Sequence, residues 1–140
     1  MRVTIANIPD CPGLAADIFS KIADKSIVVD MIVQSVGTAG KASVSFTVPR
    51  ANLQGIEELG EEFKSKLGCE VSWNPTVAKL TVRGTGLRSH TDLALRMFET
   101  LSKSRINVSL IGTSERSVNV VVDDADGETG FSLLKKEFNI

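Results

Sequence analysis

Hydrophobic and polar residues follow two regular patterns at the start of the chain. Apolar and polar side chains alternate from Arg2 to Ile8, which predicts a strand with one buried face. From Gly13 to Asp24 the apolar residues recur every three or four positions, which predicts a helix with one apolar side. The chain is therefore expected to open with a strand that leads directly into a helix.

The same two patterns continue to the end of the chain. They predict further strands at 27–35, 41–48, 69–73, 77–83, 106–113 and 118–122, and further helices at 52–67, at 90–102 and after Asp123. Apolar residues of the first half recur at one constant spacing in the second half: Phe19 and Phe98, Ile22 and Leu101, Ile27 and Ile106, Val29 and Val108, Ile32 and Ile111. A repeat of this length indicates two duplicated domains.

The order of elements predicts the fold of each copy. Both copies read strand, helix, strand, strand, helix, and the first copy adds a final strand. This order predicts an α+β protein of two ferredoxin-like (βαββαβ) domains in tandem, at 1–75 and 76–140, the second lacking one strand within this chain. The second sheet would then have an open edge, which we expect another segment of a longer protein or another chain to complete.

The turn at residues 8–15 (IPDCPGLA) has the composition of a helix start. Asp10 can accept hydrogen bonds from the first helical turn, and Pro12 suits the first helical position. The N–H groups of residues 13–15 would lie at the positive end of the helix, where a small anion such as a carboxylate can bind. Most capped helices bind nothing, so the turn alone favours a helix cap without a ligand.

Composition narrows the class of protein. A hydrophobic content of 42% is sufficient for packed cores, and 16 basic against 17 acidic residues give a net charge of −1 without a basic block, so neither nucleic acid nor membrane is an expected partner. The sequence has no long apolar run and no signal-peptide pattern, which argues against a transmembrane helix and a signal peptide. Its two cysteines have no close spacing, which predicts a reduced, cytoplasmic protein. Two cysteines and one histidine make a metal site improbable, and Trp73 is expected in the core.

With the duplication and the turn in view, the chain resembles the tandem ACT domains of aspartate kinases. The first copy contributes IPDCPGLAADIF, IVVDMIVQS and VSFTVPR to the resemblance, and the second contributes GTGLRSHTDLALRMFETL and INVSLIGTSE. The match runs over essentially the whole chain. The paired VDMIVQ and GTSE strings at corresponding points of two copies make it specific.

The resemblance implies an allosteric, regulatory role. ACT regions of this kind follow an amino-acid-kinase catalytic domain or form a separate small subunit. They imply binding of L-lysine, L-threonine or both where ACT domains pair, usually across a homodimer, and feedback regulation of L-aspartate phosphorylation. This chain alone would then have no catalytic activity and no cofactor, because ATP and Mg would belong to the kinase domain. A stand-alone ACT-type small-molecule regulator, not attached to a kinase, is the alternative.

The resemblance also implies which residues bind the effector. In the first copy these residues are Ile8, Asp10, Cys11, Gly13, Leu14 and Ala15 of the loop, and Val29, Asp30 and Gln34 of the facing strand. In the second copy they are Asn107, Val108, Thr113, Ser114 and Glu115.

These residues imply distinct roles in holding an amino acid. The loop N–H groups would hold the carboxylate of the ligand, Asp10 would accept from its ammonium group, and the Gln34 amide can donate and accept towards its side chain. The second copy has no Pro-Gly in its loop and carries Asp92 near the helix start. Because that acid would oppose a bound carboxylate, we expect one strong type of site.

Two other functional classes share the ferredoxin-like topology. An enzyme would need a nucleophile with a base or a metal cluster, and the sequence offers neither pattern. An RNA-recognition domain would need exposed aromatic residues on a basic sheet face, whereas six Phe and one Trp lie mostly on apolar stripes. The sequence therefore favours a small-molecule-binding module.

Overall fold

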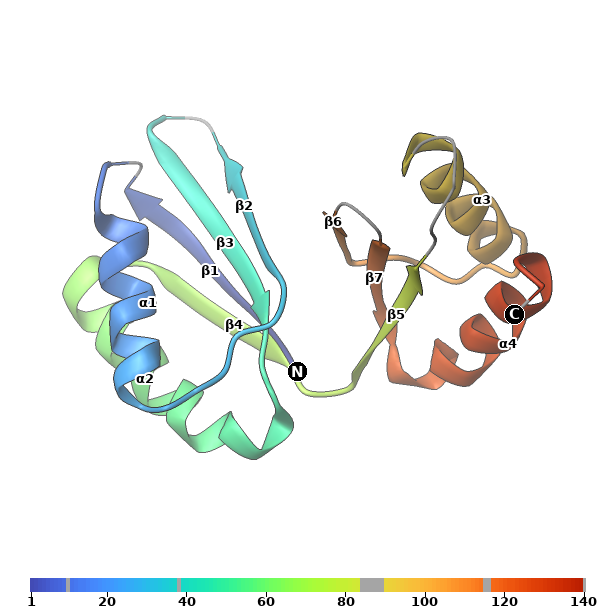
Figure 1. The fold of residues 1–140 in the computed structure, drawn as a ribbon. Coiled ribbons are helices and arrows are strands. Elements are labelled where there is room, and N and C mark those ends of the chain that lie inside the picture. Colours follow the sequence, from blue (N-terminus) through green and yellow to red (C-terminus); the bar gives the residue numbers. More distant parts are fainter. Residues whose placement is uncertain (10, 38, 84–89, 115–116, 140) are drawn as a thin grey trace. The chain divides into compact units, whose positions relative to one another are not determined.

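The structure is a computed structural model that describes residues 1–140 except 10, 38, 84–89, 115–116 and 140. The chain divides into two compact units, Met1–Pro75 and Thr76–Ile140 (Figure 1). In each unit two helices cover one face of an antiparallel sheet, and the core lies between helices and sheet.

The first unit has the complete ferredoxin-like arrangement. Its elements are β1 (Arg2–Pro9), α1 (Leu14–Asp24), β2 (Ile32–Val36), β3 (Lys41–Thr47), the short 3-10 helix η1 (Arg50–Asn52), α2 (Leu53–Leu67) and β4 (Glu70–Asn74). The strand order is β2-β3-β1-β4, and each neighbouring pair is antiparallel. The first strand therefore lies inside the sheet, with the loop that follows it at one end.

The core of the first unit follows from the two periodicities of the sequence. Ile5 of β1 lies directly opposite Val44 of β3, and both are at most 3% exposed. The helices bury Ile18 from α1 and Phe63 from α2 against this face. Alternate strand residues and one stripe of each helix thus meet in a single cluster.

The second unit has one strand fewer. Its elements are β5 (Val77–Arg83), α3 (His90–Lys103), β6 (Leu110–Ser114), β7 (Ser117–Asp123), η2 (Asp124–Asp126) and α4 (Gly127–Glu137). Among the residues that the structure describes, this sheet has three strands in the order β5-β7-β6. The predicted α+β tandem with an incomplete second sheet is confirmed, and β5 has an open edge.

Two predicted strands are shorter than their apolar patterns suggested. The strand predicted at 27–35 begins only at Ile32, and the strand predicted at 106–113 begins at Leu110. Ile27 and Met31 are buried, and the Met31 N–H donates to the Thr47 hydroxyl instead of a backbone carbonyl. The Asp30 N–H and the Met31 carbonyl still bond to the Thr47 backbone, so this segment pairs irregularly with the end of β3 and the regular ladder begins only at Ile32.

Trp73 also differs from its expectation. It is 37% exposed instead of lying in the core. It belongs to β4, which is an edge strand of the first sheet, so only one side of the strand has a neighbour. Its ring lies beside α2, where a methyl group added at Gly60 would be 3.7 Å from the ring.

Candidate functional site

A pocket of about 340 Å³ lies at the N-terminal end of α1. Its lining residues come from the end of β1, the loop, the first turns of α1 and the β2–β3 hairpin: Ile8, Pro9, Cys11, Pro12, Gly13, Leu14, Ala15, Ile18, Gln34, Ala42 and Val44. The volume is within the range of small-molecule sites, which begins near ~300 Å³. Six of the residues implied by the resemblance are therefore gathered around one cavity.

Strand pairing places the far wall of the pocket. Ile8 at the end of β1 lies opposite Ala42, and Gln34 of β2 lies opposite Val44. Directly opposed residues in an antiparallel sheet share a face, so the Gln34 side chain is on the same side as the buried Val44. Gln34 is exposed, and it supplies the one amide side chain among the described lining residues.

The helix begins at Leu14, one residue after the start of the predicted range at Gly13 and two residues after Pro12. Gly13, rather than Asp10, is the N-cap, and Leu14, rather than Pro12, is the first helical residue; Asp10 lies outside the described residues. Gly13 has φ 89, and an added methyl group there would meet nothing within 4 Å. Glycine is thus required by the backbone conformation of the turn and not by lack of space.

The start of α1 presents backbone donors to the pocket region. The Asp17 N–H donates to the Gly13 carbonyl at 3.0 Å, which is the first bond of the helix. The N–H groups of residues 14–16 precede that bond and have no intrahelical acceptor. The Leu14 N–H makes only a long contact of 3.5 Å with the Cys11 carbonyl. A helix start of this kind favours a small anion such as a carboxylate.

Val29 and Asp30 lie away from this cavity within the first unit. Both precede β2; Val29 is half-buried against the core, and Asp30 is exposed with its N–H bonded to the Thr47 carbonyl at 3.0 Å. Neither residue lines the pocket. The structure therefore brings Gln34 to the loop but leaves the beginning of the predicted facing strand elsewhere.

The implied residues of the second unit are divided between the two ends of β6. Asn107 and Val108, before the strand, line a shallow pocket of about 380 Å³ together with Phe98 of α3. Thr113 and Ser114 are the last two residues of β6, and the Ser114 hydroxyl lies 2.6 Å from the Ser117 hydroxyl. Glu115 lies outside the described residues.

The sequence analysis did not name every lining residue. Pro9 and Pro12 belong to the same loop motif, while Ile18 lies in the helix predicted at 13–24 and Ala42 and Val44 lie in the strand predicted at 41–48. The alternation along β3 could have identified Ala42 and Val44, since they face the same side as the loop end of β1.

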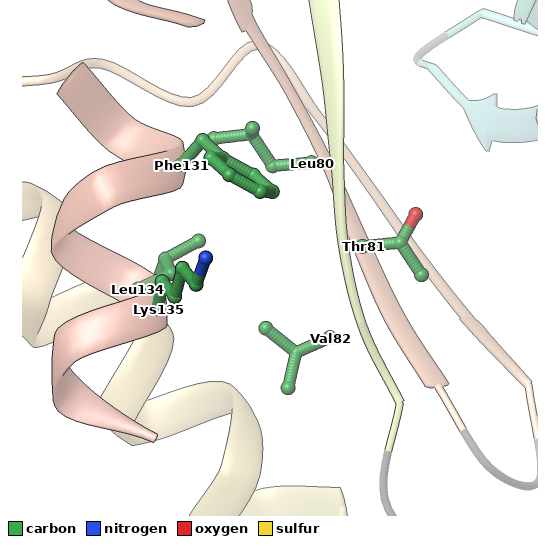
Figure 2. Close-up of a pocket in the computed structure, with 6 residues that line it drawn as sticks. All are labelled: Leu80, Thr81, Val82, Phe131, Leu134 and Lys135. Carbon is green, nitrogen blue, oxygen red and sulfur yellow. The ribbon is translucent and has the colours of Figure 1, made fainter. Parts of the chain in front are cut away.

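A third pocket, of about 310 Å³, lies between β5 and α4 (Figure 2). Leu80 extends from β5 towards Phe131 of α4 and Val82 extends to the same side of the strand, whereas Thr81 points to the other side. Phe131 is 60% exposed. The pocket is largely apolar and lies beside β5, which is an edge strand of the described sheet.

The described residues contain no group of three or more His, Cys, Asp or Glu side chains that could hold a metal ion. None of the helices in the described ranges is long and apolar enough to cross a membrane.

Comparisons with known proteins decide the family. Residues 80–138 match the model of the ACT domain family. A chain in the crystal structure of aspartokinase alpha and beta subunits is 36% identical with a TM-score of 0.89, and the match covers 99% of this chain and 92% of that one. The chain belongs to the ACT regulatory regions of the aspartokinase family. The resemblance inferred from the sequence is thereby confirmed.

Other aspartokinases match in the same way. The regulatory subunit of aspartate kinase from Thermus thermophilus, in its ligand-free form, is 30% identical with a TM-score of 0.89 over 98% of this chain and 91% of that chain. The aspartate kinase of Pseudomonas fluorescens is 36% identical over 99% of this chain. This aspartokinase ACT region spans about a third (34%) of that curated relative.

Proposed function

We propose that this aspartokinase ACT region senses L-lysine, L-threonine or both and feedback-regulates the phosphorylation of L-aspartate. The pocket at the start of α1 carries the proposal, because the loop, the helix start and Gln34 line one cavity. The curated relatives are aspartate kinases, which supports a kinase catalytic domain or subunit as the partner. ATP and Mg would be held by that partner.

The pocket has suitable chemistry for an amino acid. The N–H groups of the first turn of α1, which have no intrahelical acceptor, would hold the carboxylate. Ile8, Ile18 and Val44 would contact the aliphatic part of the ligand, since each lines the cavity with an apolar side chain. The Gln34 amide would bond to the hydroxyl of threonine or the terminal amine of lysine.

Pairing of ACT domains would complete this site. β2 carries Gln34 and is an edge strand, with β3 as its neighbour within the first sheet. Ile32 and Val36 on the same strand are 56% and 71% exposed, and exposed apolar side chains on an open edge favour association. We infer that an ACT domain of a second copy pairs along β2 in a homodimer and closes the pocket. The open edge of β5 would likewise accept a strand from a longer protein or another chain.

Thermal unfolding of the 140-residue chain tests the proposal. L-lysine, L-threonine and D-threonine are each added at millimolar concentration. A ligand at one hundred times its Kd stabilises the folded state by about 2.7 kcal/mol, which raises Tm by roughly 5 to 20 °C. We expect Tm to rise with an L-amino acid but not with D-threonine. We expect this rise in Tm to be absent in Gln34→Ala. No rise with either L-amino acid, or an equal rise with D-threonine, would contradict amino-acid sensing at this pocket.

A further inference from the structure

Just before the loop that joins β1 to α1, β1 contains one more residue than β3, its partner strand. Ile5 lies opposite Val44 and Ile8 lies opposite Ala42, so three steps along β1 match two steps along β3. Asn7, inside this interval, has φ 58, which is in the left-handed region. These features define a β-bulge at residues 6–7.

The bulge decides which side chains face the pocket. Side chains alternate along a strand, so without an extra residue Asn7 would share the core-facing side with Ile5, and Ile8 would face the other side. With the bulge, Ile8 is 4% exposed and lines the pocket. Asn7 itself is exposed. The bulge therefore sets the direction in which the chain enters the loop.

The residue type at position 7 fits this backbone conformation. Most residues with a side chain disfavour positive φ, whereas Asn tolerates it and Gly adopts it freely. Val3 and Ile5 correspond to Leu80 and Val82 in the second copy, so Asn7 corresponds to Gly84, which lies outside the described residues. Both copies thus have a residue at this point that accepts the left-handed region.

We propose that Asn7 is a positioning residue for the amino-acid site. Its left-handed backbone maintains the bulge, and the bulge holds Ile8 and the following loop in the arrangement that binds the ligand. This inference rests on the proposed sensing function. Asn7 acts through Ile8 and the loop, so its role is separate from contact with the ligand.

Two variants of the 140-residue chain form a matched test. Asn7→Gly keeps access to positive φ, whereas Asn7→Val disfavours it because valine is β-branched. Calorimetric titration with L-threonine and L-lysine measures affinity, and the nuclear Overhauser contact between Ile8 and Ala42 reports the bulge. We expect Asn7→Gly to retain both, and Asn7→Val to lose the contact and bind about tenfold more weakly. If Asn7→Val does not fold, Asn7→Ala replaces it with the same expectation.

The outcomes separate positioning from stability and from the sensing function. If Asn7→Val keeps the Ile8–Ala42 contact and its affinity while only its Tm falls, the positioning role is refuted. If the unmodified chain binds neither amino acid, the sensing function fails, and the contact alone decides the role of Asn7. Loss of the Ile8–Ala42 contact in Asn7→Val but not in Asn7→Gly would then support the positioning role of Asn7. Retention of the contact in both variants would overturn that role.

Discussion

The C-terminal end of α1 stores backbone strain that a single substitution should remove. Ser26 follows the helix with φ 57, its N–H donates to the Ala23 carbonyl at 2.9 Å, and the Ile27 N–H donates to the Ile22 carbonyl at 3.3 Å. These two bonds form a Schellman motif, in which the left-handed position is usually Gly. Ser26 is exposed, so its replacement changes little besides the backbone preference.

The expected gain can be worked out from this geometry. A residue with a Cβ in the left-handed conformation destabilises the folded state by about 1–2 kcal/mol relative to Gly. The greater conformational freedom of Gly in the unfolded chain offsets about 0.5–1 kcal/mol of the gain from introducing Gly. Ser26→Gly should therefore raise the free energy of unfolding by about 0.5–1 kcal/mol. For a domain of this size that corresponds to a rise in Tm of about 2–8 °C.

Urea and thermal unfolding followed by circular dichroism measure the effect. Ser26→Ala is the matched control, because it keeps a Cβ and hence the strain. Arg105, at the equivalent end of α3, has φ 58 and the same pair of bonds, so Arg105→Gly should stabilise as well. Gly68 after α2 has φ 65, so Gly68→Ala should destabilise by about 1 kcal/mol. Equal stability of Ser26→Gly and Ser26→Ala would refute the strain argument.

Two further predictions concern titration and thiol reactivity. Hydrogen bonds from Lys21 and Lys66 lower the pKa of Glu62 from 4.5 to about 2, so its stabilising effect should be complete above pH 4.5 and lost as pH falls towards 2. Urea unfolding should show Glu62→Gln less stable than the unmodified chain at pH 6 and equal to it near pH 2; an unchanged difference would contradict the ion-pair assignment. Cys11 is exposed, whereas burial raises the pKa of the Cys69 thiol. A disulfide reagent should therefore label one thiol in the native chain and two in denaturant, and equal native rates would disprove the assignment.

Much of the fold could be predicted because it depends on periodic burial. The alternation of Val3 and Ile5 and the helical spacing of Ile18 and Ile22 report directly which side chains lie in the core. The pattern fails at 27–31, where buried Ile27 and Met31 flank exposed residues as in a strand, but the Met31 N–H bonds to a side-chain hydroxyl. The hydrophobic pattern indicates which side chains are buried, but it does not indicate the hydrogen-bond partner of each backbone group.

The candidate site was less predictable because it depends on single backbone conformations. The loop motif indicated residues 8–15, yet it did not reveal that Gly13 is the N-cap or that Asn7 is in a bulge. Gln34 joins the pocket through the register between β2 and β3, which is set by pairing over the whole hairpin. The residues around Gln34 alone therefore do not predict which residue of β3 lies opposite it.

The two copies share what holds the fold together and differ where a ligand would be recognised. Ile27 and Ile106, at matching positions after the first helix of each unit, are both buried. The position that matches Gln34 is Thr113, which has no amide and lies outside the pocket at Asn107. The Thr113 hydroxyl can also donate and accept, but the Gln34 amide is longer and has two N–H donors besides its carbonyl acceptor, so the first unit offers more hydrogen bonds from this position. The duplication thus provides two frameworks, of which we propose that the first carries the amino-acid site.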